Sequence, residues 1–244
     1  MVKMDAMEEV VRRRLAEKER KKWEKYLPEY NEAISNAINE YYTRISKRLR
    51  EMLSLDAREV EELLKEIGVD TIIEKILKNL SPEKVGDIYL ENVDMVKAEI
   101  QERIAKLRNN ELRAVDMDFL KSYLFDGLDL VRVRDIKVEK LTEIAKKKGI
   151  EKALKDEIIY KVTREIFPTE EDFRKYTEKY KKYIKGLFEN MGGIFYPIRE
   201  KEPDIWTAIE PIFSEITIIY NAFFNFYDKI KEEEIREIYG KSKK

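Results

Sequence analysis

The side chains of this chain that could do chemistry are carboxylates, lysines and tyrosines, because its 244 residues include neither histidine nor cysteine. Without cysteine there is no disulfide, thiolate nucleophile or thiolate metal ligand. Without histidine the chain lacks the usual general base near neutral pH and the commonest transition-metal ligand. Ser–His–Asp triads, Cys–His pairs and histidine-containing zinc or di-iron sites are therefore excluded, whereas carboxylate–Mg²⁺ and lysine chemistry stay possible.

The densest group of aspartates is Asp116, Asp118, Asp126 and Asp129. Such a group could hold Mg²⁺ or Ca²⁺, but its spacing lacks the alternate acids, glycine and later glutamate of an EF-hand loop. A helix cap at Asp116 and a turn at Asp126–Gly127 explain two of the four acids without a metal. The chain has 8 glycines and no Walker A or GxGxxG motif. We therefore expect no metal, no cofactor and no catalytic residue.

Basic residues are concentrated in blocks, although Lys plus Arg (49) and Asp plus Glu (50) nearly cancel over the whole chain. Residues 131–164 hold 11 basic and 6 acidic side chains. A local excess of positive charge is typical of surfaces that bind phosphate backbones, whereas solvated faces that pair within the fold are the simpler interpretation. The candidate nucleic-acid-binding residues in this block are Arg132, Arg134, Lys146, Lys147, Lys148, Lys152 and Lys155.

Part of this block, residues 141–160 (LTEIAKKKGIEKALKDEIIY), resembles a helix-turn-helix. Ala145 is the small residue expected where two helices cross, and Gly149 follows four residues later, where the turn needs a residue that tolerates positive φ. The resemblance implies that lysines of the second helix face DNA. The sequence departs from the pattern at Lys148 and Lys155, where apolar residues are usual, and a plain helical hairpin explains the same spacing.

Tyrosines alternate with lysines along residues 173–188. Tyr176, Tyr180 and Tyr183 could stack on bases while neighbouring lysines contact phosphates. Their helical spacing instead favours a buried row of rings covered by lysine stems, so we expect these tyrosines in the core.

The strongest structural pattern lies near the carboxyl end, in residues 204–230 (DIWTAIEPIFSEITIIYNAFFNFYDKI). Its apolar residues recur in steps of four and three, which is the pattern of a helix that packs on another helix. A helix that is apolar on two faces is either central to a bundle or an association surface. If it is an association surface, its candidate oligomer-interface residues are Ile209, Ile216, Phe223 and Phe226.

Most of the remaining chain also shows helical periodicity, and the fold class we predict is mainly α, a multi-helix antiparallel bundle. The expected helices before the carboxyl-terminal one are 3–27, 29–53, 57–67, 70–80, 82–109, 139–148, 150–167 and 170–191. Alternation of valine and arginine predicts a small β element near 128–138, and the best partner strand is residues 191–198. We divide the chain into an N-terminal helical region (1–110), a small α/β or helix-turn-helix-like region (111–168) and a C-terminal helical region (169–244).

These features favour a non-catalytic binding or assembly protein that uses long helices for protein–protein contacts, with a protein partner or self-association. The alternative is a DNA- or RNA-binding protein that uses the helix-turn-helix-like element at 141–160. A signal peptide and a segment of roughly 20 apolar residues that could span a bilayer are both missing, so we expect a cytoplasmic protein without membrane contact. Abundant lysine and glutamate with few glycines and prolines indicate a thermophilic source,.

Overall fold

The computed structural model describes residues 5–80, 117–192 and 203–240, together with a few positions between 98 and 109. These residues form nine α-helices and no strand, so the prediction of a mainly α fold is confirmed for the described part of the chain. The helices are α1 (Ala6–Glu24), α2 (Leu27–Leu53), α3 (Ala57–Ile67), α4 (Val69–Leu80), α7 (Met117–Lys148), α8 (Ile150–Ala153), α9 (Asp156–Ile166), α10 (Glu170–Gly192) and α12 (Pro203–Tyr239).

The chain divides into two compact units that are interleaved in sequence. Unit 1 contains the described residues of 1–23, 85–186 and 230–244, and unit 2 contains those of 24–84 and 187–229. The three consecutive regions expected from the sequence stay a prediction, because the packing of residues into units does not say which segments fold autonomously. The predicted helix at 82–109 lies mostly outside the described residues.

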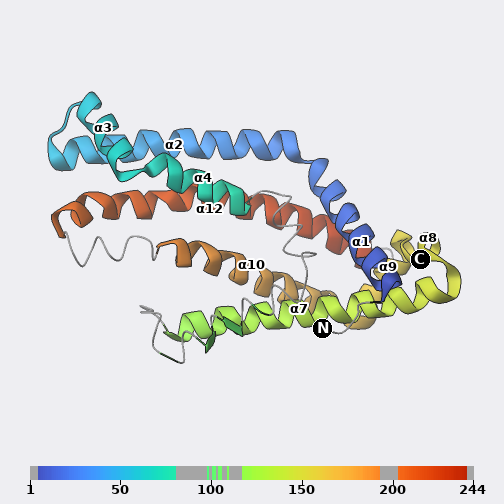
Figure 1. The fold of residues 1–244 in the computed structure, drawn as a ribbon. Helices are drawn as coiled ribbons and strands as arrows, with labels where there is room; N and C mark the ends of the chain where they lie inside the picture. Colours follow the sequence, from blue (N-terminus) through green and yellow to red (C-terminus); the bar gives the residue numbers. More distant parts are fainter. Residues whose placement is uncertain are drawn as a thin grey trace. The chain divides into compact units, whose positions relative to one another are not determined.

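In unit 2, α4 returns antiparallel to α2 (Figure 1). The hydroxyl of Tyr30, near the start of α2, donates to the carbonyl of Leu80 at the end of α4, with an oxygen–oxygen distance of 2.9 Å. The chain between α2 and α4 is formed by α3 and its two caps. Asp56 begins α3 in a capping box with Glu59, and Gly68 ends α3 with φ 75°, in the left-handed region. These caps satisfy backbone groups that would otherwise lack partners where the chain reverses.

The part of α12 in unit 2 packs antiparallel to α2. The ring of Tyr30 meets those of Phe223 and Phe226 edge to face, with centroids 6.4 and 5.5 Å apart. Towards the other end of α2, Arg48 pairs with the buried Glu215 of α12 at 2.9 Å. The predicted carboxyl-terminal helix is therefore confirmed, and the described seam residues Ile216, Ile219 and Phe223 are buried.

In unit 1, α1, the second half of α7, α8 and α9 share one apolar core. Val11 and Leu15 of α1 fill it from one side, and Ala145 and Ala153 allow close approach on either side of the turn at Gly149. The buried members of this core are Val11, Leu15, Val138, Leu141, Ala145, Ala153, Leu154, Ile159 and Val162. The carboxylate of Asp5, just before the start of α1, pairs with Lys146 in the last turn of α7, so α1 runs antiparallel to α7.

The predicted β element near 128–138 is wrong, because these residues form the middle of α7. Val131, Arg134 and Val138 are buried in steps of three and four, which is the helical period,. The alternation of two valines with two arginines is too short to distinguish a strand from a helix, and Gly127 lies within the helix rather than in a turn,. Of the proposed partner strand, residues 191 and 192 end α10, and residues 193–198 lie outside the described residues.

The helix predicted from 150 to 167 begins at Ile150 but divides in two. α8 ends at Ala153, and Lys155 adopts an extended conformation (φ −64°, ψ 142°) before α9 begins at Asp156. The break follows from burial, because Ala153 and Leu154 both turn into the core shared with α7. The predicted interruption at Gly149 is confirmed, with φ 89° and ψ 151°.

The remaining part of unit 1 joins α9, α10 and the end of α12. Thr169 and Asp172 form the predicted reciprocal cap at the start of α10: the N–H of Asp172 donates to the Thr169 hydroxyl oxygen at 3.1 Å. Tyr176, Tyr180 and Tyr183 are buried, which confirms their prediction as core residues. At the end of α12, the hydroxyl of Tyr239 donates to the carbonyl of Phe167, which follows α9, at 2.8 Å.

Candidate functional site

Four exposed lysines surround the turn that follows α7, and we call them the lysine surface: Lys147, Lys148, Lys152 and Lys155. The first two lie in the last turn of α7, where cations interact favourably with the carbonyl end of the helix dipole,. Lys152 lies on α8, and Lys155 precedes α9. The turn at Gly149 thus brings lysines from three consecutive elements to one end of unit 1.

None of these four lysines forms an ion pair with another described residue, in contrast to their neighbours. Lys146, just before them, pairs with Asp5, and Asp156, just after them, pairs with Lys18. The exposed acids closest in sequence to the lysine surface that have no such pair are Glu151 and Glu157. The four lysines therefore outnumber the nearby free carboxylates, and the local potential is positive.

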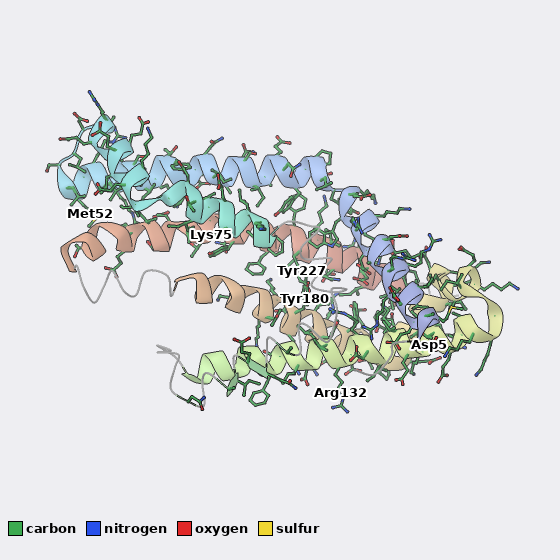
Figure 2. All side chains as sticks on the ribbon, in the orientation of Figure 1. Asp5, Met52, Lys75, Arg132, Tyr180 and Tyr227 are labelled. Atoms are coloured by element: carbon green, nitrogen blue, oxygen red, sulfur yellow. The ribbon has the colours of Figure 1, made fainter. Side chains whose placement is uncertain are left out.

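The two arginines predicted to share this surface lie elsewhere on α7. Arg132 is exposed and points away from the helix (Figure 2). Arg134 is only 3% exposed. Fifteen residues separate Arg132 from Lys147, which corresponds to about 22 Å along a helix. The structure therefore groups the predicted lysines around Gly149 and separates the arginines from them.

A second charged group lies inside unit 1, and it is not among the candidate sites named from the sequence. We call it the ion cluster: Glu19 and Lys22 of α1, Lys137 of α7, and Lys231 and Glu234 of α12. The side chain of Glu234 is 9% exposed and accepts from Lys231 Nζ at 2.7 Å. Lys22 Nζ lies 3.6 Å from the other Glu234 oxygen and 3.5 Å from Glu19 Oε1. One buried carboxylate thus joins α1 to α12.

The lysines of the ion cluster differ in the direction in which their pKa values are shifted. Burial tends to lower the pKa of Lys22 and of Lys231, but attraction to Glu234 and Glu19 is stronger and raises both pKa values. For Lys137 burial dominates, and its pKa is lowered despite the same two carboxylates. Burial also tends to raise the pKa of Glu234, yet three neighbouring lysines hold this pKa well below its ordinary value,.

The ion cluster was missed because each of its local patterns is ordinary. Glu19 with Lys22, and Lys231 with Glu234, have the i,i+3 spacing of solvated pairs on a helix surface,. One signal was present: Glu234 lies four residues after Ile230 and four before Ile238, both buried, so it interrupts an apolar seam. A charged residue at a seam position indicates a buried polar contact with another helix.

The acidic group considered as a metal site is only partly described. Asp129 pairs with Lys179 at 2.7 Å, and burial raises the pKa of the half-buried Asp126. Asp116 and the side chain of Asp118 lie outside the described residues. Within the described part of the chain, no three acidic side chains lie close enough to hold a metal ion together.

The candidate interface residues of α12 lie in the interior of unit 2 where they are described. Ile216 and Phe223 are buried, and Phe226 is half-buried against Tyr30. The side chain of Ile209 lies outside the described residues. The three described side chains contact their own chain, and the prediction of an oligomer interface at these residues stays a prediction.

Comparison with protein-family models, curated proteins and solved structures finds no significant match. Among the described helices, none has a stretch both apolar and long enough to cross a bilayer.

Proposed function

We propose that this chain is a non-catalytic binding protein whose partner is nucleic acid, contacted through the lysine surface. The observation that carries this proposal is the group of four exposed lysines, none of them paired with a carboxylate of the described chain, on a well-packed end of unit 1. Lysines that are already exposed and not engaged in ion pairs can neutralise phosphates without breaking contacts in the fold.

The same region favours contact with the phosphate backbone over reading of bases. In a DNA-binding helix-turn-helix the second helix enters the major groove with its amino-terminal residues foremost. Here α8 has only four residues, and α9 begins with Asp156 and Glu157, whose carboxylates would repel phosphates. We therefore expect binding that depends on charge and depends little on sequence.

A titration of generic duplex DNA and RNA at several salt concentrations tests the proposal. Four phosphate contacts predict that log K falls with log salt with a slope of about −3 to −4. Neutralising all four lysines with glutamine should abolish binding, and Lys152→Gln alone should reduce the steepness of the slope by about 0.9. Absence of binding at low salt, where phosphate contacts are strongest, would eliminate the proposal.

The matched control is Lys75→Gln in unit 2. Lys75 is an exposed lysine of α4 that forms no ion pair with a described residue (Figure 2). This substitution removes the same charge outside the lysine surface, so it should leave the slope unchanged. An equal loss for Lys75→Gln and Lys152→Gln would mean that net charge, rather than the lysine surface, determines binding.

Self-association or docking of a protein partner through the long helices stays a second candidate. The observation that favours it is the carboxyl end of α2, where Met52 is 50% and Leu53 39% exposed. Light scattering after size-exclusion chromatography tests self-association. A dimer that becomes a monomer in Met52→Lys would support this candidate, whereas a monomer at high micromolar concentration would oppose it.

A further inference from the structure

We propose that the lysine surface is one part of a larger binding surface, that α1 supplies the other part, and that the nucleic acid bound there is double-stranded. The part on α1 is a row of three cations, which we call the α1 stripe: Arg14, Lys18 and Lys21. This inference rests on the proposed function, because it specifies which form of nucleic acid the chain binds and how many phosphates it contacts.

The first observation is the spacing of the α1 stripe. Its three residues are separated by four and three positions, so they lie along one side of α1,. Lys21 is exposed and forms no ion pair with a described residue. Arg14 pairs with Glu17 at 3.4 Å, and the two side chains are 54% and 41% exposed. A pair as exposed as this contributes little stability, so a phosphate can replace the carboxylate at small cost.

The second observation is the place of the α1 stripe in unit 1. Helix α1 packs against α8 and α9 in the apolar core of this unit (Figure 1). Lys18, in the middle of the stripe, pairs with Asp156, the first residue of α9. Lys155 of the lysine surface directly precedes Asp156, and Arg14 lies one turn before Lys18 on the same side of α1,. The α1 stripe therefore borders the lysine surface.

The third observation concerns aromatic rings, because proteins that bind single strands stack bases on exposed rings. Trp23, the aromatic residue of α1, is 4% exposed. Tyr160, that of α9, is half-buried and donates its hydroxyl to Glu237. Phe125 of α7 is exposed, but it lies 22 residues before Lys147, about 33 Å along the helix,. Near their cations these helices thus offer phosphate contacts without a stacking platform, which favours a duplex.

The cations of α1 are also held at fixed positions. Arg14 and Lys21 are about 10 Å apart along the helix, and the core shared with α8 and α9 holds α1 in place. A duplex is straight over such a distance and carries about one phosphate charge per 1.7 Å of its axis. It can therefore meet the α1 stripe and the lysine surface together, whereas a flexible single strand has to be ordered first.

The experiment titrates the full chain with a DNA duplex of mixed sequence, and separately with one of its strands, at several salt concentrations. The lysine surface alone predicts a slope of log K against log salt of about −3 to −4, and two further contacts from Arg14 and Lys21 make it about −5 to −6 for the duplex. Lys18 is not counted, because it is paired with Asp156. At low salt the duplex should bind about tenfold or more tightly than the strand, since its charge density is higher.

Two double variants of α1 test the α1 stripe. Arg14→Gln combined with Lys21→Gln should make the slope for the duplex shallower by about 1.8. The matched control combines Arg13→Gln with Arg20→Gln, which removes two exposed arginines that lie off the stripe and form no ion pair with a described residue. This control should leave the slope unchanged. Glutamine is a good helix former, so both double variants should fold.

Three results would separate this inference from the proposed function. A duplex slope of about −3 to −4 that is the same in both double variants would overturn the part of the α1 stripe and leave the lysine surface as the binding site. A single strand that binds as tightly as the duplex would overturn the preference for a duplex. Absence of any binding at low salt would overturn the proposed function, and this inference with it.

Discussion

The two units hold their helices together in different ways. In unit 2, α2 and α12 meet mainly through aromatic and aliphatic side chains, with Tyr30 and Phe223 edge to face. In unit 1, α1 meets α12 at a buried carboxylate, Glu234, shared by lysines of two helices. Both units also have apolar cores. The difference lies in the side chains at one contact in each unit, which are mainly apolar between α2 and α12 in unit 2 and charged between α1 and α12 in unit 1.

This difference determines which contacts between helices should depend on pH and on charge. Burial of apolar side chains contributes free energy that does not depend on the ionisation of any group, so it changes little with pH. A buried ion pair contributes less net stability, since desolvation opposes it, but losing one partner is costly. Unit 2 should therefore respond mainly to side-chain volume, and unit 1 to charge and to pH.

The largest expected effect is truncation in the apolar contact of unit 2. Phe223 is fully buried, so Phe223→Ala should lower the free energy of unfolding by about 3–5 kcal/mol,. Urea denaturation measures this loss, which should be nearly the same at pH 5 and pH 8. Phe224→Ala, at the half-buried neighbouring position, is the control and should cost clearly less. Equal losses of stability in the two variants would contradict the interpretation that burial of Phe223 stabilises the contact between α2 and α12.

The next largest effect is expected at the ion cluster. Glu234→Gln leaves three lysines without their shared carboxylate and should cost about 3 kcal/mol, at the low end for a buried pair because Lys22 is a third exposed,. The exposed Glu178 of α10 offers the control Glu178→Gln, which should change stability by less than about 0.5 kcal/mol,.

The pH dependence of the same variant tests the electrostatics of the ion cluster. The pKa of Glu234 is lowered on folding, so the unfolded chain binds the proton more tightly. Its contribution is therefore complete above the ordinary pKa of 4.5 and is lost as the pH falls towards the folded value,. Denaturant titrations at several pH values should give a shallower acid-side decline for Glu234→Gln. An unchanged decline would show that other carboxylates dominate acid unfolding.

A smaller effect is expected from the two glycine turns, one in each unit. Gly149 of unit 1 has φ 89° and ψ 151°, a conformation almost confined to glycine, and no atom lies within 4 Å of an added Cβ,. Gly149→Ala should therefore cost about 1–3 kcal/mol from backbone strain alone. Gly68→Ala in unit 2, at φ 75° and ψ 35°, should cost about 1–2 kcal/mol,. Thermal unfolding measures both, and a reversed order would contradict the interpretation.

The smallest effect is expected at the ion pair of unit 2. Glu215 is buried, but its partners Arg48 and Arg44 are half exposed. Glu215→Gln should therefore cost about 1 kcal/mol or less, and raising the salt concentration should reduce that cost. Glu210→Gln, at an exposed position of the same helix, is the control. A loss as large as that of Glu234→Gln would remove the contrast between the two units.

The sequence predicted the long helices well because each has a local signal. The seam of α12, the stripe of α2 and the capping residues Asp56 and Thr169 all act within a few residues of their own helix. Residues 128–138 were misassigned because a short alternation fits two periods, and only burial against other helices decides between them,.

The lysine surface and the ion cluster also differ in how far the sequence could predict them. The lysine surface was predictable, since its four residues lie within nine positions and exposed lysines need no partner. The ion cluster was not predictable from composition or motif, because Glu19, Lys137 and Glu234 become neighbours only when three helices pack. Arg134 illustrates the same limit: helical period places it on the buried face of α7, although its residue type suggested exposure.

The bond between Tyr239 and the carbonyl of Phe167 has a consequence for local opening of the chain. Terminal helical turns ordinarily fray, because their last groups have only solvent to bind. Here the final turn of α12 is held by a carbonyl 72 residues earlier, and burial raises the pKa of this hydroxyl to about 12, so it stays protonated over the physiological range. Amide protons in this last turn should therefore exchange with solvent as slowly as those in mid-helix.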